Sequence, residues 1–300
     1  MDVADIDVSV VVPTFNRSAL LGRALASVAA QTVPVREVIV VDDGSNDGSE
    51  TVVERSALAA RYFWQPNRGV SAARNVGIRE ALSSWIAFLD SDDEWRPEKL
   101  EKQLEGVSRA PQFRVCHTEE IWIRNGQRVN PRRRHRKRGG RMFRACLPLC
   151  AISPSSVLIH RSVFEDVGTF DEELPACEDY DLWLRICSRY PVLLIDEPLI
   201  VKYGGHADQL SRGWGLDRFR IVALERVLAG AALDPADELA ARETLVKKLS
   251  VYLAGARRRG RAEEVQRLEA RRRHHRELIE RDLAGRVEIL TPTPARDTGP

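Results

Sequence analysis

The chain has 300 residues, of which 43% are hydrophobic and 30% charged; this composition is typical of a globular protein and excludes a chain that is disordered throughout. No apolar run approaches the roughly 20 residues that a helix needs to span a bilayer, so no integral membrane helix is expected. The net charge is only +2, from 46 basic and 44 acidic residues, and the whole chain therefore has no strong electrostatic preference for a partner.

Two features of the sequence favour a cytoplasmic protein. The first residues, MDVADIDVSVVVP, carry acids where a secretory signal would carry bases. The five cysteines are odd in number and include no C-x-x-C pair, which disfavours a disulfide framework and a zinc ribbon. They are Cys116, Cys146, Cys150, Cys177 and Cys187.

Strand and helix patterns alternate over the first hundred residues. Short apolar runs predict four strands, at 8–12, 38–41, 62–64 and 85–89, of which the first two have the pattern of buried strands. Apolar residues at helical spacing predict helices between them, the first containing Leu20 to Val28, the second Val52 to Leu58 and the third Val70 to Leu82. This alternation predicts an α/β fold with a mainly parallel sheet covered by helices.

The pattern changes after residue 112. Residues 113–123 alternate as a strand does, and Asn125-Gly126 is a hairpin signal. Further strands are predicted at 155–159, 192–195 and 199–203, and an amphipathic helix at 178–189. From Leu216 onward the pattern is helical, and residues 291–300 have the composition of a disordered tail.

Polar residues follow three of the predicted strands. In an open parallel sheet, ligands bind outside the carboxyl ends of the strands. The segments Pro13-Thr14, Asp42-Asp43 and Asp90-Ser91-Asp92 all lie at such ends. We therefore expect these residues, although they are distant in sequence, to meet along one edge of the sheet.

The acids of Asp90-Ser91-Asp92-Asp93 can be interpreted in two ways. Alternate residues at a strand end can direct two carboxylates to one divalent cation, which prefers oxygen ligands and keeps positions open for phosphate oxygens. The pair would then hold a nucleotide diphosphate. The alternative is a solvated acidic turn that caps the next helix.

Asp42 and Asp43 also leave two interpretations open. Paired acids after a buried strand occur in phosphoacceptor receiver domains, but there they follow the first strand, whereas these follow the second. An acid at this position can instead accept a hydrogen bond from a base N–H or a ribose hydroxyl.

Three further positions are candidates for chemistry. Arg74 lies in the first turns of a helix, where arginines favour anions, although a surface arginine is as plausible. Glu178-Asp179 begins another helix; acids there complement the helix dipole, or one of them serves as a general base. His206 follows a strand and is a possible third metal ligand or a surface residue.

Taken together and in order, these motifs closely resemble the family 2 glycosyltransferases. The segments that carry the resemblance are VVVPTFNR at 10–17, VIVVDDGS at 38–45, NRG at 67–69 with ARN at 73–75, FLDSDD at 88–93 and EDYDLWL at 178–184. The resemblance covers residues 6 to 210. It implies the GT-A fold and a metal-dependent, inverting transfer from a nucleotide-activated sugar.

The resemblance also implies roles for individual residues. Thr14, with Pro13 and Asn16, would lie beside the nucleotide. Asp42 would contact the base, with Asp43 nearby, and Arg74 would face the nucleotide. Asp90 and Ser91 would approach the ribose or the metal, Asp92 would be the principal metal ligand, and Asp179 the catalytic base. The acceptor side would include Glu178 and Trp183.

The implied cofactors are Mn²⁺ or Mg²⁺ and a nucleotide-diphosphate sugar, with a UDP-sugar as the expected donor. The implied acceptor is a carbohydrate or a lipid-linked sugar in cell-surface polysaccharide or glycolipid synthesis. We expect a donor half at 1–112, an acceptor half at 113–215, a helical extension at 216–290 and a tail at 291–300.

The sequence departs from the family pattern at one motif, and two other functions are less consistent with it. A Q-x-x-R-W motif, found in processive synthases, is only approximated by the QLSRGW segment at 209–214, which favours a non-processive enzyme. A catalytically inactive nucleotide-sugar-binding module would keep the fold, but retention of Asp92 and Asp179 argues against it. A nucleic-acid binder is disfavoured because the arginine clusters lack interleaved aromatic residues.

The segment at 132–141, RRRHRKRGGR, contains seven lysines and arginines and no acid. Such a run has little to bury, so it predicts an exposed, mobile loop. It could close over an anionic acceptor or contact an anionic membrane surface at the inner face of the membrane, and a merely solvated loop is the alternative.

Overall fold

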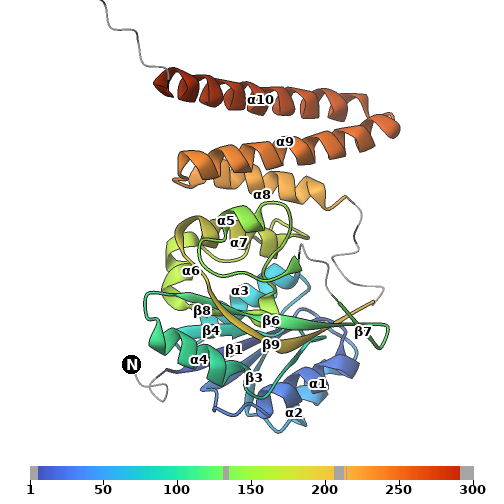
Figure 1. Cartoon of the computed structure of the whole chain (residues 1–300). Helices are drawn as coiled ribbons and strands as arrows, with labels where there is room; N and C mark the ends of the chain where they lie inside the picture. Colours follow the sequence, from blue (N-terminus) through green and yellow to red (C-terminus); the bar gives the residue numbers. More distant parts are fainter. Residues whose placement is uncertain (1–5, 131–134, 206–212, 214, 291–300) are drawn as a thin grey trace, which may run out of the picture. The chain divides into compact units, whose positions relative to one another are not determined.

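The computed structural model describes residues 6–130, 135–205, 213 and 215–290, and these residues contain one nine-stranded sheet (Figure 1). Four parallel strands form its first part in the order β3-β2-β1-β4. They are β1 (Val8–Thr14), β2 (Glu37–Asp42), β3 (Ala60–Trp64) and β4 (Trp85–Phe88). The predicted parallel strands of the first hundred residues are thus confirmed, although β3 is only partly buried, with Trp64 exposed.

The second part of the sheet is mixed, with the order β4-β8-β6-β9-β5 and β7 paired to β6. Its strands are β5 (Glu94–Trp95), β6 (Val115–Arg124), β7 (Gln127–Val129), β8 (Leu158–His160) and β9 (Leu193–Gly204). The β8 strand is antiparallel to β4, whereas β6 and β9 are parallel. Asn125 and Gly126 form the predicted hairpin with φ values of 49° and 76°.

Two strand predictions need correction. Pro13 does not end β1, which continues to Thr14. The Val11 carbonyl accepts a hydrogen bond from the Leu89 N–H on the β4 side. Pro13, two residues later, has its backbone nitrogen on the same side. The last pair of the β1–β4 ladder is Val11–Phe88, so Pro13 lies beyond it. Its missing N–H therefore costs no ladder bond. The runs at 192–195 and 199–203 form one strand, β9, whose pairing with β6 shifts register near residues 118–120.

Helices cover both faces of the sheet (Figure 1). Those that precede residue 217 are α1 (Ser18–Ala29), α2 (Ser49–Glu54), α3 (Val70–Glu80), α4 (Lys99–Arg109), α5 (Phe143–Cys146), α6 (Arg161–Val167) and α7 (Glu178–Arg189), with a 3₁₀ turn at Pro154–Ser156. The bounds predicted for α7 are confirmed, whereas α2 ends at Glu54 rather than near Leu58. Alternate β1 residues divide between the faces: Val10 and Val12 join α1 and α4 in one core, and Val11 meets α3.

The contact between α3 and β1 is very close. Gly77 of α3 faces Val11, and a Cβ atom added at Gly77 would lie 2.2 Å from Val11 Cγ1. Because Val11 is fully buried and a contact that short cannot exist, no larger residue fits at this separation. A glycine therefore sets the distance between the helix and the strand.

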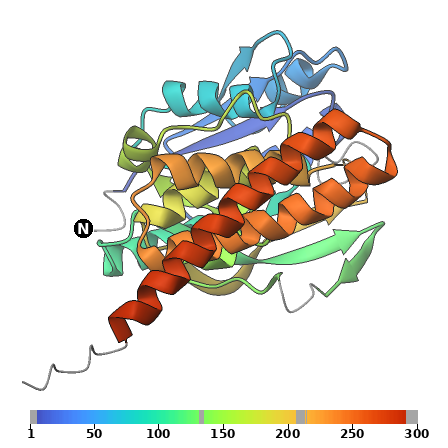
Figure 2. The same ribbon diagram turned by 90° about the horizontal axis from the view of Figure 1, so that it is seen from above.

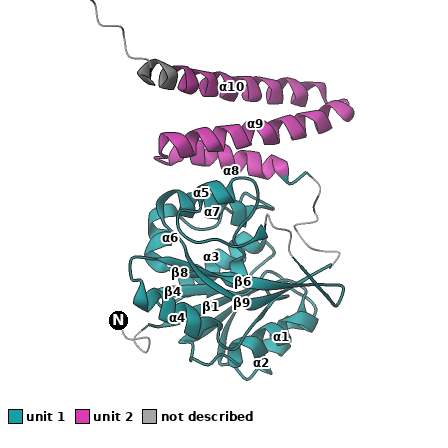
Figure 3. Ribbon diagram, viewed as in Figure 1, with its two compact units in different colours: residues 1–216 teal, residues 217–300 magenta. Residues whose placement is uncertain are grey.

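Residues 217–300 form a second compact unit, separate from residues 1–216 (Figure 3). Its helices are α8 (Asp217–Gly230), α9 (Pro235–Arg258) and α10 (Ala262–Leu290). The α9 helix contacts both α8 and α10 (Figure 2). It begins with Asp234, whose carboxylate accepts hydrogen bonds from two backbone N–H groups, and with proline in its first turn, both of which favour helix initiation.

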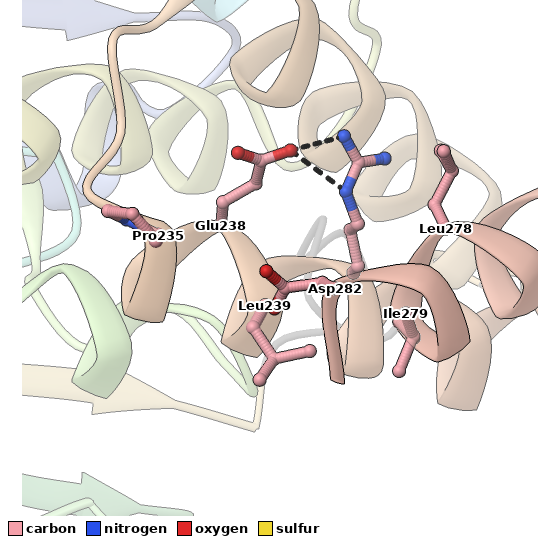
Figure 4. Close-up of a pocket in the computed structure, with 7 residues that line it drawn as sticks. Pro235, Glu238, Leu239, Leu278, Ile279 and Asp282 are labelled. Atoms are coloured by element: carbon pink, nitrogen blue, oxygen red, sulfur yellow. Dashed lines mark hydrogen bonds and ion pairs between the residues drawn. The ribbon is translucent and has the colours of Figure 1, made fainter. Parts of the chain in front are cut away.

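A pocket lies between α9 and α10 (Figure 4). It is lined by Pro235, Glu238, Leu239, Arg242, Leu278, Ile279 and Asp282. Arg242 Nε donates to Glu238 Oε1 at 3.0 Å. These two charged side chains of the pocket wall, both on α9, therefore pair with each other. Within the described ranges, no helix has both the length and the apolar character needed to cross a membrane.

Candidate active site

The sheet brings the predicted strand-end residues to one edge. Thr14 pairs with Asp42 in the register of β1 and β2, and the Asp43 N–H donates to the Thr14 carbonyl at 2.9 Å. Asp90 follows β4 after one residue, Leu89. Pro13 belongs to β1 itself, and Asn16 lies in the turn after it with a φ of 49°.

The carboxylate of Asp42 is buried and holds two neighbouring segments. Its Oδ1 accepts the Ser45 N–H at 2.7 Å, and its Oδ2 accepts the Tyr62 hydroxyl at 2.7 Å. Burial raises the pKa of Tyr62, and its bond to Asp42 raises it further. The sequence predicts Tyr62 only as a strand residue. Its hydroxyl reaches Asp42, two residues beyond its own register partner Val40, and no local motif indicates this contact.

Asp43 organises the loop that leads into α3. Its Oδ2 accepts the Gly69 N–H at 2.7 Å, and its Oδ1 accepts the Arg68 N–H at 2.9 Å and the Gln65 side-chain amide at 2.6 Å. The loop before α3 is therefore tied to the end of β2. Asp43 binds backbone N–H groups of that loop, and Asp42 binds the Ser45 N–H. The two aspartates thus fix the loops at the sheet edge on which Thr14 lies.

Arg74 is the central charged residue of this edge. Its guanidinium is buried and donates to Asp90 Oδ1 at 2.7 Å and to Glu178 Oε1 at 2.8 Å. Burial acts to lower the pKa of Arg74, but the two carboxylates outweigh it and raise that pKa. Arg74 thereby joins the strand-end acid to the first residue of α7.

The pKa values of Asp90 and Glu178 shift in opposite directions, although both acids contact Arg74. Burial tends to raise the pKa of Asp90, yet Arg74 and Lys202 hold it below its ordinary value. Burial and the neighbouring Asp179 raise the pKa of Glu178 in spite of Arg74. Glu178 is buried against the arginine, so its contact in this structure is with Arg74 and not with an exposed acceptor surface.

Asp92 and Asp93 point to different partners. Asp92 Oδ2 lies 2.6 Å from Arg17 Nη1, and its carbonyl accepts a bond from Arg23 at 2.8 Å. Asp93 accepts the Ser155 hydroxyl at 2.6 Å in the protein interior. Burial raises the pKa of Asp93 to about 8, against the opposing effect of Lys202. The four-residue acidic segment is therefore not a uniformly solvated turn. Ser91, between the acids, is also buried.

The carboxylates at this edge can be considered as ligands for a divalent cation. Among the residues that the structure describes, no three His, Cys, Asp or Glu side chains gather as a metal site. Asp90 and Asp92 nevertheless offer carboxylate oxygens at the same strand end, which fits a hard cation that takes its other ligands from a diphosphate and water. His206 lies outside the described residues.

Asp179 occupies the first turn of α7. It is half-buried. Its Oδ1 accepts the Tyr180 N–H at 2.7 Å, and its Oδ2 lies 3.0 Å from the thiol of Cys150. Cys177, immediately before the helix, has a left-handed φ of 64°. Strained backbone of this kind is common where side chains are placed for function. Trp183, expected on the acceptor side, is fully buried and belongs to the packed core.

The basic segment differs from its prediction. Residues 131–134 lie outside the described residues, but the segment that follows is anchored. Lys137 is only 7% exposed, and its Nζ lies 3.0 Å from Glu120 Oε1. Gly140 pairs with Val192 as a β-bridge. The expectation of an exposed loop is therefore wrong for Lys137, which pairs with a buried acid on β6, whereas Arg136, Arg138 and Gly139 are exposed.

Comparison with known proteins identifies the class. The family model described as glycosyl transferase family 2 matches residues 9–168, more than half of the chain. The chain therefore belongs to glycosyltransferase family 2. An uncharacterized glycosyltransferase of Rickettsia conorii is 31% identical over 220 residues, which are 68% of this chain and 35% of that protein.

Two other relatives show the range of the similarity. An uncharacterized glycosyltransferase of Rickettsia prowazekii is 30% identical over 68% of this chain and 65% of its own length. TuaG of Bacillus subtilis, whose name assigns it provisionally to teichuronic acid biosynthesis, is 38% identical over 33% of this chain and 40% of its own. The chain thus spans from about a third to just under two thirds of the length of these relatives.

The fold is shared with solved structures. Residues 1–349 of S. aureus TarS in complex with UDP-GlcNAc match with a TM-score of 0.66 and 22% identity, covering 81% of this chain and 72% of that chain. The same TarS fragment in complex with UDP has a TM-score of 0.63. The predicted α/β, GT-A fold with helices after it is confirmed.

Proposed function

We propose that this chain transfers a sugar from a nucleotide-diphosphate sugar to an acceptor hydroxyl, with a divalent cation and with inversion at the anomeric carbon. The observation that carries the proposal is the position of Arg74. It bonds Asp90, at the end of β4, and Glu178, the neighbour of Asp179. The acids proposed for the donor side and for proton transfer thus belong to adjoining parts of one charged network.

On the donor side, Thr14, Asp42 and Arg74 lie at the edge where a nucleotide would bind, with Pro13, Asn16, Asp43 and Ser91 beside them. Asp42 accepts a hydrogen bond from the base or ribose, and Asp43 holds the loop that borders it. Asp92, with Asp90, would hold Mn²⁺ or Mg²⁺; the cation, when bound, stabilises the charge of the departing diphosphate. His206 would be an additional ligand.

On the acceptor side, Asp179 acts as general base. It takes the proton of the acceptor hydroxyl while that oxygen forms its bond to the anomeric carbon. The bond from that carbon to the diphosphate breaks in the same displacement, and its electron pair leaves with the nucleotide diphosphate. Attack opposite the leaving group inverts the configuration.

The proposed donor is a UDP-sugar. The TarS fragment was solved with UDP-GlcNAc and with UDP, and the shared fold supports the same class of donor here. The proposed acceptor is a carbohydrate or a lipid-linked sugar of a cell-surface polymer, in keeping with the name of TuaG.

The basic segment at 132–141 is proposed to contact the anionic part of a lipid-linked acceptor or an anionic membrane surface. Lys137 is excluded from this role because it is paired inside the protein. The remaining arginines would each contribute on the order of 1 kcal/mol near an anionic surface, less at high salt. Replacing Arg132, Arg133, Arg134 and Arg136 with Ser should weaken binding to anionic liposomes at low salt; unchanged binding and acceptor KM would contradict this role.

A donor screen tests the main proposal. Purified protein is incubated with a panel of nucleotide sugars and Mn²⁺ or Mg²⁺, and release of nucleotide diphosphate and transfer to acceptor are measured. The Asp179→Asn variant should keep donor affinity and lose transfer by roughly a hundredfold, the scale of a general base. Donor binding without transfer or hydrolysis in the wild type, across acceptors, would instead indicate a non-catalytic binding module.

A further inference from the structure

The thiol of Cys150 contacts the carboxylate proposed as the base. Cys150 Sγ lies 3.0 Å from Asp179 Oδ2, while the Tyr180 N–H donates to Oδ1 at 2.7 Å. Each carboxylate oxygen therefore has a neighbouring donor on the protein. Because each oxygen has two lone-pair sites, one site per oxygen is still available for a substrate proton.

The single thiol proton has two acceptors within reach. Cys150 Sγ lies 3.2 Å from the Ile152 carbonyl as well as 3.0 Å from Asp179. The carboxylate is both nearer and charged, and hydrogen bonds to a charged acceptor are the stronger ones. Burial raises the pKa of Cys150 well above its ordinary value, and Asp179 raises it further, so the thiol keeps its proton at neutral pH and donates.

The segment that carries Cys150 is held at several points. Tyr180 Oη donates to the Leu147 carbonyl at 2.6 Å. Lys137 Nζ donates to the Ala151 carbonyl at 3.0 Å, and Lys202 Nζ donates to Ser153 Oγ at 2.7 Å. Bonds on both sides of Cys150 thus fix its backbone against the first turn of α7.

We propose that Cys150 is a positioning residue for Asp179: its thiol holds the carboxylate in the orientation needed for proton transfer and stabilises the ionised form. The proposal deepens the proposed function and rests on Asp179 being the base. Cys150 itself does not touch the reacting atoms in this scheme. Its effect passes through one hydrogen bond, which a change of one side-chain atom can remove.

The pH profile of transfer tests this role in Cys150→Ala and Cys150→Ser. Loss of the thiol donor destabilises the carboxylate, so the acidic limb of the kcat profile should move to higher pH by about half a unit. At pH 7, kcat should fall about three- to tenfold while the donor KM changes little, since only the orientation of the base is lost. Serine, whose hydroxyl also donates, should restore most of the wild-type profile.

Cys116→Ala is the matched control. Cys116 is a buried thiol of β6 that bonds the Gln103 amide and the His117 carbonyl, so its removal costs packing of the same kind without touching Asp179. It should leave the position of the acidic limb unchanged, although it lowers the melting temperature. An equal pH shift in Cys116→Ala would overturn the positioning role.

A second measurement reports the contact without using activity. The alkylation rate of Cys150 by iodoacetamide, followed by peptide mass spectrometry at pH 8, is compared between the wild type and Asp179→Asn. Removal of the carboxylate charge should lower the thiol pKa and increase the rate several-fold, since the thiolate is the reactive form. An unchanged rate would overturn the contact.

The failures are distinguishable. If Asp179→Asn loses transfer while Cys150→Ala keeps the wild-type pH profile, the positioning role is wrong and the proposed base stands. If Asp179→Asn transfers sugar at the wild-type rate, the assignment of the base is wrong, and the role of Cys150 falls with it.

Discussion

The guanidinium of Arg17 lies 2.6 Å from the carboxylate of Asp92, so the acid proposed as the principal metal ligand is already paired with a cation of the chain. A divalent ion bound by Asp92 would compete with Arg17 for the same oxygen. Because both side chains are partly accessible, at 20% and 12% of their full exposure, the pair is expected to be weak enough to open.

Arg17→Ala should therefore tighten Mn²⁺ binding in the absence of nucleotide. Exposed ion pairs contribute about 0.5–1 kcal/mol, and this pair is less exposed, so a change in Kd of at least about two- to fivefold is expected. Isothermal titration calorimetry measures it directly. Arg36→Ala, which breaks the Arg36–Asp7 pair, is the control and should leave the Mn²⁺ affinity unchanged.

Asp92→Asn should abolish metal-dependent transfer and leave the fold intact. The substitution keeps the size of the side chain but removes a charge that would hold the ion against the diphosphate. The far-ultraviolet circular dichroism spectrum should match that of the wild type, and Mn²⁺ affinity should fall. Wild-type turnover by this variant with excess chelator present would refute the assignment.

Arg74→Met should be strongly destabilising. The side chain is only 4% exposed and lies between Asp90 and Glu178, so its loss leaves the buried Glu178 without its cation and removes one of the cations beside the partly buried Asp90. Breaking a buried pair by removing one partner costs about 3–5 kcal/mol. Urea denaturation checks this, and Arg61→Met, at the more exposed Arg61–Glu37 pair, should cost far less. A loss no larger than that of Arg61→Met would contradict the expectation.

The Lys137–Glu120 pair should behave as a unit. Both side chains are about 95% buried, and they lie 3.0 Å apart. Lys137→Met leaves the Glu120 charge buried and should cost about 3–5 kcal/mol. The double variant Lys137→Met/Glu120→Gln should recover part of that loss, because no uncompensated charge remains. Additive losses in urea denaturation would show that the two residues are not coupled.

Lys99 should make stability depend on pH. It is fully buried beside the Trp95 ring, 3.8 Å from the ring centroid. Burial lowers its pKa to about 7 in the folded protein. Between pH 7 and the ordinary lysine pKa, the unfolded chain binds the proton that the folded chain has lost, so the free energy of unfolding rises with pH.

The measurement is the difference between the wild type and Lys99→Met in urea denaturation from pH 6 to pH 10. The wild type should gain relative to the variant as pH rises, by up to about 1.4 kcal/mol per pKa unit of depression. Below pH 7 the difference in unfolding free energy between the wild type and the variant should become constant, since Lys99 is then protonated in both the folded and the unfolded protein. A constant difference over the whole range would show that Lys99 has an ordinary pKa.

The sequence was sufficient where one local pattern dominated. The α7 helix could be predicted in both bounds because acids at its first turn and apolar residues at helical spacing agree. The strand-end acids could be placed together because parallel strands end at one edge. Neither inference depends on knowing which side chains meet across the sheet.

The rest depended on tertiary partners. Lys137 sits in a run of bases and has the pattern of a solvated residue; only the position of Glu120 on β6 shows why it is buried. Cys150 has no local motif that links it to Asp179, 29 residues away. Nothing in its immediate sequence indicates that contact, which arises from the way the 147–153 segment returns to α7.

Gly77 is the only residue small enough to fit between α3 and β1 at their present separation. A methyl group at this position would have to push α3 away from β1, because the nearest atoms belong to a fully buried valine. Arg74 lies one helical turn earlier, so the same displacement would withdraw its guanidinium from Asp90. A substitution at Gly77, which touches neither carboxylate, would thus disconnect Asp90 from Arg74, and it could be compensated by a smaller residue in place of Val11.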